Sequence, residues 1–156
     1  MTTAAERQAM IDEIRQLPAR VEALVKDLNP EQLDAPGGEG EWTVRQVVHH
    51  LADSHMNSFI RLKLILTEEK PTLKPYNQEA WAMLPDTYQL PVQPTLQILH
   101  GLHQRWVTLF ETVGETNWSR VGFHPEIGEI TIDDILRIYA THCREHVAQI
   151  NRVLGR

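Results

Sequence analysis

The feature that most constrains the fold is a long apolar stripe with helical spacing between residues 43 and 68. Thr43 with Gln46 fits a capping box, in which two residues satisfy each other's unpaired backbone donors. Trp42, just before the cap, is placed to pack on Val47 as a hydrophobic staple. The sequence therefore predicts a helix that starts at Thr43 and ends at residue 67 or 68. Its apolar face repeats every three or four residues and consists of Val44, Val47, Val48, Leu51, His55, Ser58, Phe59, Leu62, Ile65 and Leu66.

Three further stretches show the same helical spacing of apolar residues, at positions 3–28, 94–114 and 131–154. Pro18 lies inside the first stretch and is expected to kink or restart that helix, because proline removes a backbone donor. Gly114 is the expected C-cap of the second, and Thr131 with Asp134 marks the start of the third. Four long amphipathic helices in about 150 residues predict an all-α fold, a four-helix bundle that forms one domain over residues 1–156.

Three connections join these helices, and the one between the second and third helices is the longest. Asn29 and Pro30 predict a short helical turn, and residues 34–41 have the composition of a loop. Residues 70–94 contain five prolines and are long for a link between two helices, although Asn77 is placed to cap a short helix through Met83. Residues 121–123 and 129–131 are suited to a short hairpin. A long crossover between the second and third long helices is normal in bundles that do not run up-down-up-down.

Composition and charge restrict the class of protein. The formal net charge is -6, which argues against a nucleic-acid partner, because such proteins usually present a basic face. No apolar run approaches the roughly 20 residues that span a bilayer, and the first residues lack the pattern of a signal peptide. Cys143 is the only cysteine, so no intramolecular disulfide is possible. We therefore expect a soluble cytoplasmic protein with neither a nucleic-acid nor a membrane partner.

Two histidines near the C-terminus are the first candidates for chemistry. His142 and His146 stand four residues apart, so both side chains lie on one face of the predicted helix at residues 131–154. That face is apolar, and an imidazole without a partner is costly to bury there. A divalent metal is one suitable partner, because each neutral ring offers one lone pair. Taken alone, the spacing favours two core histidines that bond to other side chains.

The helix at residues 43–68 adds three more histidines. His50 lies on a polar strip at the flank of the apolar stripe and His55 lies inside the stripe, so either can supply a third ligand. His49 points away from the stripe and is expected to be solvated. Asp53 follows His50 by three residues and is either an acceptor that orients a ligand ring or an exposed carboxylate. Three histidines on two helices would leave a coordination position open, which is the pattern of catalytic zinc sites.

The residues between His142 and His146 suggest two further roles, and neither is favoured. Cys143 could complete the metal site as a thiolate, but its place on the buried side favours a small core residue. Residues 142–146 also match H-x-x-E-H, a zinc-protease pattern in which Glu145 would be the general base. Glu145 lies roughly 130° from the centre of the apolar stripe, so it is expected to face solvent. The sequence contains no glycine-rich phosphate loop, G-x-S-x-G elbow or dinucleotide fingerprint.

Several segments together resemble the YfiT-type branch of the DinB superfamily. They are W-T-V-R-Q-V-V-H-H-L-A-D-S-H-M-N from residue 42, P-Y-N-Q-E-A-W from residue 75, G-F-H-P-E from residue 122 and H-C-R-E-H from residue 142. The resemblance covers nearly the whole chain. It implies a bundle with an up-down-down-up course and a metal held by His50, His142 and His146. It thereby selects His50 over His55, a choice that helix geometry leaves open.

The resemblance also implies an activity. Proteins of this branch are described as metal-dependent hydrolases that bind zinc or nickel and form cytoplasmic homodimers. Related members are thiol S-transferases that use bacillithiol or a similar low-molecular-weight thiol. The implied function is therefore a hydrolase with one divalent metal per chain, Zn²⁺ or Ni²⁺, that activates water or a thiol toward a small-molecule substrate. The alternatives are S-transfer in detoxification and a non-catalytic metal-binding role in stress response.

Three polar residues are predicted to contact the substrate. Helix geometry places Asn57 and Arg61 on the same polar strip as His50, and Tyr76 follows in the long crossover. Together with Asp53, they complete the candidate site.

Overall fold

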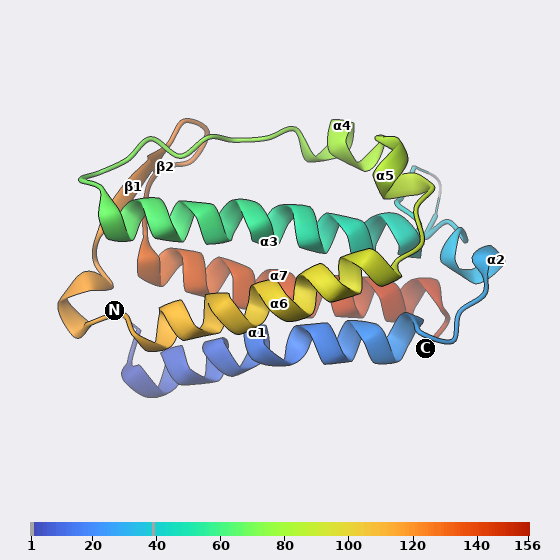
Figure 1. The fold of residues 1–156 in the computed structure, drawn as a ribbon, viewed down its shortest axis with the longest axis horizontal. Helices are drawn as coiled ribbons and strands as arrows, with labels where there is room; N and C mark the ends of the chain where they lie inside the picture. The colour runs from blue at the N-terminus through green and yellow to red at the C-terminus, as the bar shows by residue number, and fades with distance from the viewer. Residues whose placement is uncertain (1, 39) are drawn as a thin grey trace.

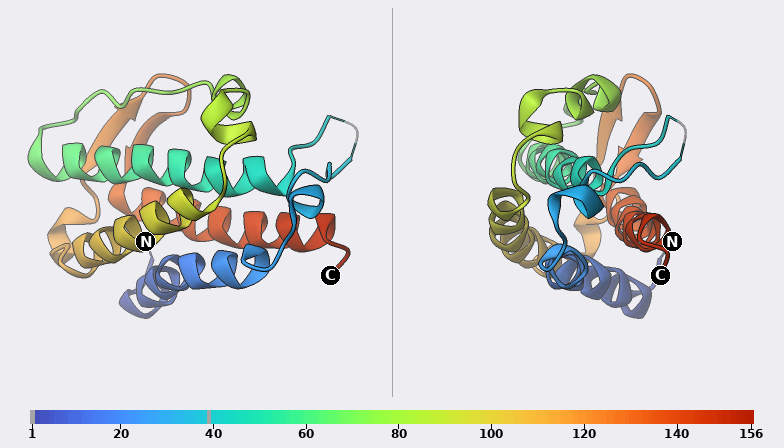
Figure 2. Two further views of the ribbon diagram at one scale, coloured as in Figure 1. Left: turned by 45° about the vertical axis from the view of Figure 1, so that its right-hand side comes forward. Right: turned by 90° about the vertical axis from the view of Figure 1, so that its right-hand side faces the viewer.

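Four long helices form the body of the protein (Figure 1). The computed structural model describes residues 2–38 and 40–156. The long helices are α1 (Ala4–Val25), α3 (Val44–Thr67), α6 (Gln93–Glu111) and α7 (Ile132–Val153). Helices α1 and α7 run in one direction and α3 and α6 in the other, which confirms the predicted up-down-down-up course. Each long helix packs on two others in the cyclic order α1, α7, α3, α6, as the end-on view in Figure 2 shows.

The predicted capping boxes fix where the two helices of the candidate site begin. Thr43 Oγ1 accepts a hydrogen bond of 3.2 Å from the backbone N–H of Gln46, and the Gln46 side chain accepts one of 3.0 Å from the backbone N–H of Thr43. Thr131 and Asp134 make the same reciprocal pair at the start of α7. Because each box satisfies two donors that the helix cannot, the first turns of α3 and α7 are set by local sequence.

Of the two effects predicted for Pro18, a restart of the helix is not seen, and the predicted end of α6 is wrong. Pro18 does not restart α1, which continues from Ala4 to Val25; the apolar side chains on either side of Pro18, Leu17 and Val21, are buried in the core, and this packing offsets the lost backbone hydrogen bond. Helix α6 ends at Glu111, before the expected cap at Gly114. Gly114 has φ of -63° and leads into the 3-10 turn η1 (Glu115–Asn117), so it does not adopt the left-handed conformation of a C-cap glycine.

The short elements lie mainly in the connections. They are α2 (Pro30–Leu33), α4 (Gln78–Ala82), α5 (Pro85–Tyr88), β1 (Val121–His124) and β2 (Gly128–Thr131). The side chains of Asn29 and Asn77 cap α2 and α4 as predicted, and β1 pairs with β2 as an antiparallel hairpin. Helix α5 was not expected from the sequence. The crossover between α3 and α6 lies along the outer side of α3, where α4 and α5 pack on that helix.

The core fills the space between the four long helices. Its fully buried side chains include Ile14, Leu51, Leu62, Leu99, Trp106, Ile135 and Leu136. Polar side chains that share this interior, above all histidines, therefore need partners inside the bundle. Among the described residues, no helix combines the length and the apolar character that a membrane span requires.

Candidate metal centre

Three histidine side chains from two antiparallel helices converge near the start of α3 and the C-terminal half of α7. His50 comes from the second turn of α3, and His142 and His146 lie one turn apart on α7. The Nε2 atom of His142 lies 3.2 Å from Nε2 of His50 and 3.0 Å from Nε2 of His146. One nitrogen from each ring lies within 4.8 Å of the other two. Helical spacing aligns His142 with His146, and the packing of α3 against α7 brings His50 to them.

Burial keeps the three rings neutral. It lowers the pKa of His50 to about 3 and that of His142 to about 2, with further lowering from the neighbouring imidazoles. Burial also lowers the pKa of His146. A charged imidazole in this interior would lose its hydration, so the neutral form is favoured at pH 7. Each ring therefore carries one nitrogen with a free lone pair.

The distances between these nitrogens fit a divalent metal. Two ligand nitrogens of a tetrahedral zinc site are about 3.3 Å apart when each Zn–N bond is about 2.0 Å, which is close to the two measured separations. The side-chain oxygen Oε1 of Gln149 accepts a hydrogen bond of 2.7 Å from Nδ1 of His146, so Nε2 of this neutral ring has a bare lone pair. Such lone pairs repel one another unless a cation or a proton lies between them.

His50, His142 and His146 form the histidine cluster. His55 contacts this cluster through His142 and is not one of its three converging rings. Its Nε2 atom lies 3.0 Å from Nδ1 of His142, and its Nδ1 atom lies 2.8 Å from Nε2 of His103. His55 is fully buried and packs beside Trp106 and Tyr139. Both of its ring nitrogens are thus engaged with other histidines. His103 was not singled out from the sequence, because a lone histidine at a helical core position carries no distinguishing signal.

His49 is not solvated, contrary to the prediction. It is only 5% exposed; its Nε2 atom lies 3.0 Å from the backbone oxygen of Leu90 and its Nδ1 atom 2.6 Å from Oγ1 of Thr95. Arg45, one turn earlier on α3, donates to the same Leu90 oxygen and forms a two-pronged ion pair with Asp34. The end of the crossover therefore covers the face of α3 that a helix wheel assigns to solvent.

The other predicted site residues lie along α3 and the crossover. Asn57 donates a hydrogen bond of 2.8 Å to the backbone oxygen of Asp53, and Arg61 donates one of 2.7 Å to the backbone oxygen of Lys74. Tyr76 packs against Trp81 with ring centroids 4.6 Å apart. Burial and the nearby carboxylate of Asp86 raise the pKa of Asp53 to about 6.

In the described part of the chain, the converging histidines hydrogen-bond to His55 and Gln149, and the Asp53 carboxylate is not among their partners. Burial raises the pKa of Tyr76 to about 12.

The two residues considered between His142 and His146 lie where they were predicted. Cys143 is buried in the core and Glu145 is exposed.

A small cavity opens beside the histidine cluster. It has a volume of about 250 Å³. Trp42 stands at its edge, with its ring centroid 4.6 Å from that of His50, and its Nε1 atom donates a hydrogen bond of 3.1 Å to Glu79. The start of α3 and the start of α4 therefore form the mouth of the site. The lining residues are Gly40, Glu41, Trp42, Gln78, Glu79, His146 and Gln149.

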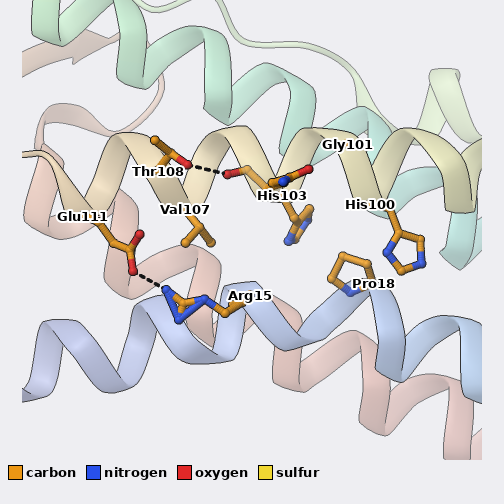
Figure 3. A pocket seen from close by; sticks show the side chains of 9 residues that line it. Arg15, Pro18, His100, Gly101, His103, Val107, Thr108 and Glu111 are labelled. Carbon is orange, nitrogen blue, oxygen red and sulfur yellow. Dashed lines mark hydrogen bonds and ion pairs between the residues drawn. The ribbon is translucent and has the colours of Figure 1, made fainter.

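A larger groove, of about 520 Å³, lies on the opposite side of the bundle between α1 and α6 (Figure 3). Arg15 and Glu111 form an ion pair across it, and His103 contributes to its wall. The groove is therefore linked to the histidine cluster through the buried ring of His103, which contacts His55.

Comparison with known proteins shows the family of this chain and agrees with its fold. The family profile of the DinB superfamily matches residues 13–150, and the chain belongs to that superfamily. "Putative metal-dependent hydrolase OB0782" of Oceanobacillus iheyensis is 48% identical over 146 residues, which cover 94% of this chain and 84% of the relative. A Bacillus cereus protein named "Putative metal-dependent hydrolase" has the same identity and coverage.

A solved structure is also similar to this chain. YfiT from Bacillus subtilis, described as "a probable metal-dependent hydrolase with an unusual four-helix bundle topology", matches with a TM-score of 0.95 and 39% identity. The match covers 98% of this chain and 88% of YfiT. The fold predicted from the family resemblance is thereby confirmed.

Proposed function

We propose that the protein is a metal-dependent hydrolase in which His50, His142 and His146 bind one divalent metal through their Nε2 atoms. The observation that carries this proposal is the convergence of three neutral imidazole nitrogens, at separations of 3.0 and 3.2 Å about His142, beside an open cavity. The names of the relatives support the same activity. When bound, a divalent metal with three histidine ligands supplies Lewis-acid chemistry and keeps a coordination position open to a small molecule. Zn²⁺ is the metal we propose, with Ni²⁺ as the alternative.

The surrounding side chains have distinct roles in this proposal. Trp42 covers one face of His50, so the site is open mainly toward the cavity at Gln149. The cavity limits the substrate to a small molecule or to one end of a larger one. Asp53, with its pKa raised to about 6, can hold or release a proton near neutral pH. Tyr76, with its pKa raised to about 12, remains a hydrogen-bond donor at neutral pH.

Asn57 and Arg61 are proposed to shape the substrate side of the site. Both side chains already donate to backbone oxygens, of Asp53 and Lys74. They are therefore suited to hold the wall formed by α3 and the crossover in place, and only their remaining donors are available to a substrate.

Metal content and turnover test the proposal together. Protein purified without chelators should contain about one divalent metal per chain, and it should hydrolyse members of an ester and amide panel without added thiol. His50→Ala and His142→Ala should lose both the metal and the activity, whereas the exposed-residue control His100→Ala should keep both. Absence of metal in the wild-type protein would contradict the proposal. Turnover of an electrophile only with a low-molecular-weight thiol would replace hydrolysis by S-transfer.

We also propose that the protein is a homodimer. Support comes from apolar side chains that the crossover leaves exposed, namely Met83 at 66% and Leu84 at 49%, because exposed large apolar groups that cluster are typical of association surfaces. Sedimentation analysis should give twice the chain mass, and Met83→Glu should shift the protein toward the monomer. A monomer at micromolar concentration would contradict this assignment.

A further inference from the structure

Three imidazole rings form a continuous line from the candidate metal centre across the core. His142 Nδ1 lies 3.0 Å from His55 Nε2, and His55 Nδ1 lies 2.8 Å from His103 Nε2. The line ends where His103 Nδ1 meets the backbone oxygen of Ile14 at 2.6 Å. One residue comes from each long helix, in the order α7, α3, α6 and α1. His55 and His103 are 0% and 1% exposed, so water does not replace these partners.

The backbone carbonyl of Ile14 fixes the direction of every hydrogen bond in the line. A carbonyl oxygen only accepts, so Nδ1 of His103 must carry the hydrogen. A neutral imidazole has one donor and one acceptor, so Nε2 of His103 accepts from Nδ1–H of His55. By the same rule, Nε2 of His55 accepts from Nδ1–H of His142. His142 is thereby left with a bare lone pair on Nε2, the atom that faces His50 and His146.

The opposite direction is excluded by the ends of the line. Reversal would place a lone pair of His103 against the Ile14 oxygen at 2.6 Å, a contact between two acceptors. It would also place a hydrogen on Nε2 of His142, where a metal would have to bind. A charged His103 ring could donate to the Ile14 oxygen in either direction, but the reversed line would still place a hydrogen on Nε2 of His142. The charged form is also costly, because in the described part of the chain no carboxylate hydrogen-bonds to His55 or His103 and an unpaired buried charge is unfavourable.

We infer that His55 and His103 are positioning residues that hold His142 in the tautomer whose Nε2 atom can bind the metal. The inference rests on the proposed function, because it assumes the three-histidine metal site. A carbonyl on α1, one of the two long helices that contribute no ligand, thereby sets the protonation of a ligand on α7. Partners of this kind raise metal affinity by about 10-fold to 100-fold in other histidine sites.

Two substitutions at position 55 distinguish a positioning histidine from an ordinary core residue. A phenylalanine at position 55 fills a similar volume between Trp106 and Tyr139 but accepts nothing from Nδ1–H of His142. A glutamine can place Oε1 near the position of the lost Nε2 atom and accept that hydrogen bond. If His55 served only to fill space, Phe would be the better replacement. If it serves to orient His142, Gln would be the better one.

Zinc affinity and the tautomer of His142 test the inference. Competition with a chromophoric chelator should give His55→Gln an affinity for Zn²⁺ within about threefold of wild type. The loss should be about 10-fold to 100-fold in His55→Phe and about 10-fold in His103→Phe. The matched control is His49→Phe, which removes a buried histidine of the same helix that lies outside the line, and its zinc affinity should stay within about threefold of wild type.

A second measurement uses the unaltered protein. Long-range ¹H–¹⁵N correlation spectra of the metal-free wild type should show His142 protonated on Nδ1 and bare on Nε2, and His55→Phe should lose this preference. A wild-type His142 protonated on Nε2 would overturn the inference even if no variant folds. Equal zinc affinity of His55→Phe and His55→Gln would overturn it while leaving the metal site intact. A wild-type protein that binds no zinc would overturn the proposed function and the inference with it.

Discussion

At the scale of single residues, neighbours on one helix have separate roles. His49 and His50 are adjacent in sequence, yet His49 bonds to Leu90 and Thr95 under the crossover while His50 faces α7. The difference follows from the 100° turn between successive helical residues, which directs the two rings toward different neighbours. His55 lies inside the apolar stripe. It contacts the proposed ligand His142, but it does not point to the place where the three candidate ligands meet. Residue identity alone therefore does not assign a role to any of these histidines.

A first prediction concerns Asp53, whose raised pKa has a consequence for stability. Its folded-state pKa of about 6 exceeds the unfolded value of 3.8, so folding disfavours the ionised form and its cost is present in full above pH 6. Asp53→Asn should therefore stabilise the protein at pH 8, by about 1 kcal/mol after allowance for its partial exposure. The gain should fall to about half that value at pH 5. Urea unfolding at the two pH values measures it.

The control for Asp53 is an exposed carboxylate. Asp27 has a side chain that is 86% exposed, and Asp27→Asn should change stability by less than about 0.5 kcal/mol at either pH. Loss of stability in Asp53→Asn at pH 8 would show that the carboxylate is held by favourable contacts in the folded state.

At the scale of elements, the hairpin is attached to the bundle by close contact with the crossover. Phe123 of β1 accepts a hydrogen bond from the backbone of Leu73 and donates one to Pro71, both of 2.8 Å. Gly122 makes this approach possible, because a Cβ atom there would lie 2.9 Å from Leu73 and 3.0 Å from Ile65. Both of those neighbours are fully buried, so they cannot move aside at low cost.

A second prediction uses two glycines as a matched pair. Gly122→Ala should destabilise the protein by about 1–3 kcal/mol, because the added methyl group overpacks a buried contact. Gly101→Ala, in the middle of α6 where a Cβ atom meets nothing within 4 Å, should stabilise it by about 0.5–1 kcal/mol through helix propensity. Thermal unfolding of both variants measures the difference. Similar effects of the two substitutions would contradict the contact assigned to Gly122.

At the scale of the whole molecule, the line of histidines connects all four long helices. Ile14, His55, His103 and His142 each come from a different helix, so this polar network spans the interior of the bundle. A fully bonded network of this kind rigidifies a core, whereas loss of one member leaves buried groups unpaired. The candidate site is therefore supported by helices that do not contribute a proposed ligand.

A third prediction follows for the pH dependence of the metal-free protein. Burial lowers the pKa of His103 from 6.5 to about 4, so its contribution to stability is present above pH 6.5 and is lost as the pH falls toward 4. Between pH 7.5 and pH 5 the loss from His103 alone should be about 2 kcal/mol. Urea unfolding in the presence of a chelator should show a correspondingly smaller decrease for His103→Phe. An equal decrease in the two proteins would show that His103 is not buried as a neutral ring.

A fourth prediction concerns metal removal. A ligand that binds only the folded state at one hundred times its dissociation constant stabilises that state by about 2.7 kcal/mol. For a chain of this size, this corresponds to a decrease in melting temperature of about 5–10 °C when a chelator removes the metal. His146→Ala should melt at the lower temperature of the metal-free protein, whether or not a chelator is present. A melting temperature of the wild type that does not respond to chelator would contradict the proposed centre.

The sequence by itself determined the four long helices and the placement of side chains within each of them. The capping residues Thr43 and Thr131 act on the first turns of their own helices, and the spacing of apolar residues indicates which face of each helix is buried. Helix starts and buried faces can therefore be predicted from the local sequence. The pairing of His142 with His146 follows from helical spacing alone. The resemblance to a known family, and not the spacing, selected His50.

Only the tertiary structure decided what each face meets. A helix wheel gives the angle of His49 or His55 to its own apolar stripe, but not the segment that packs there. The crossover covers His49, and His55 lies between His142 and His103 because α3, α6 and α7 converge at that level. Pro18 stays inside α1 because the packing of its apolar neighbours outweighs its local preference. Gly114 is exposed and begins the 3-10 turn η1, in which its backbone oxygen accepts a hydrogen bond from Asn117.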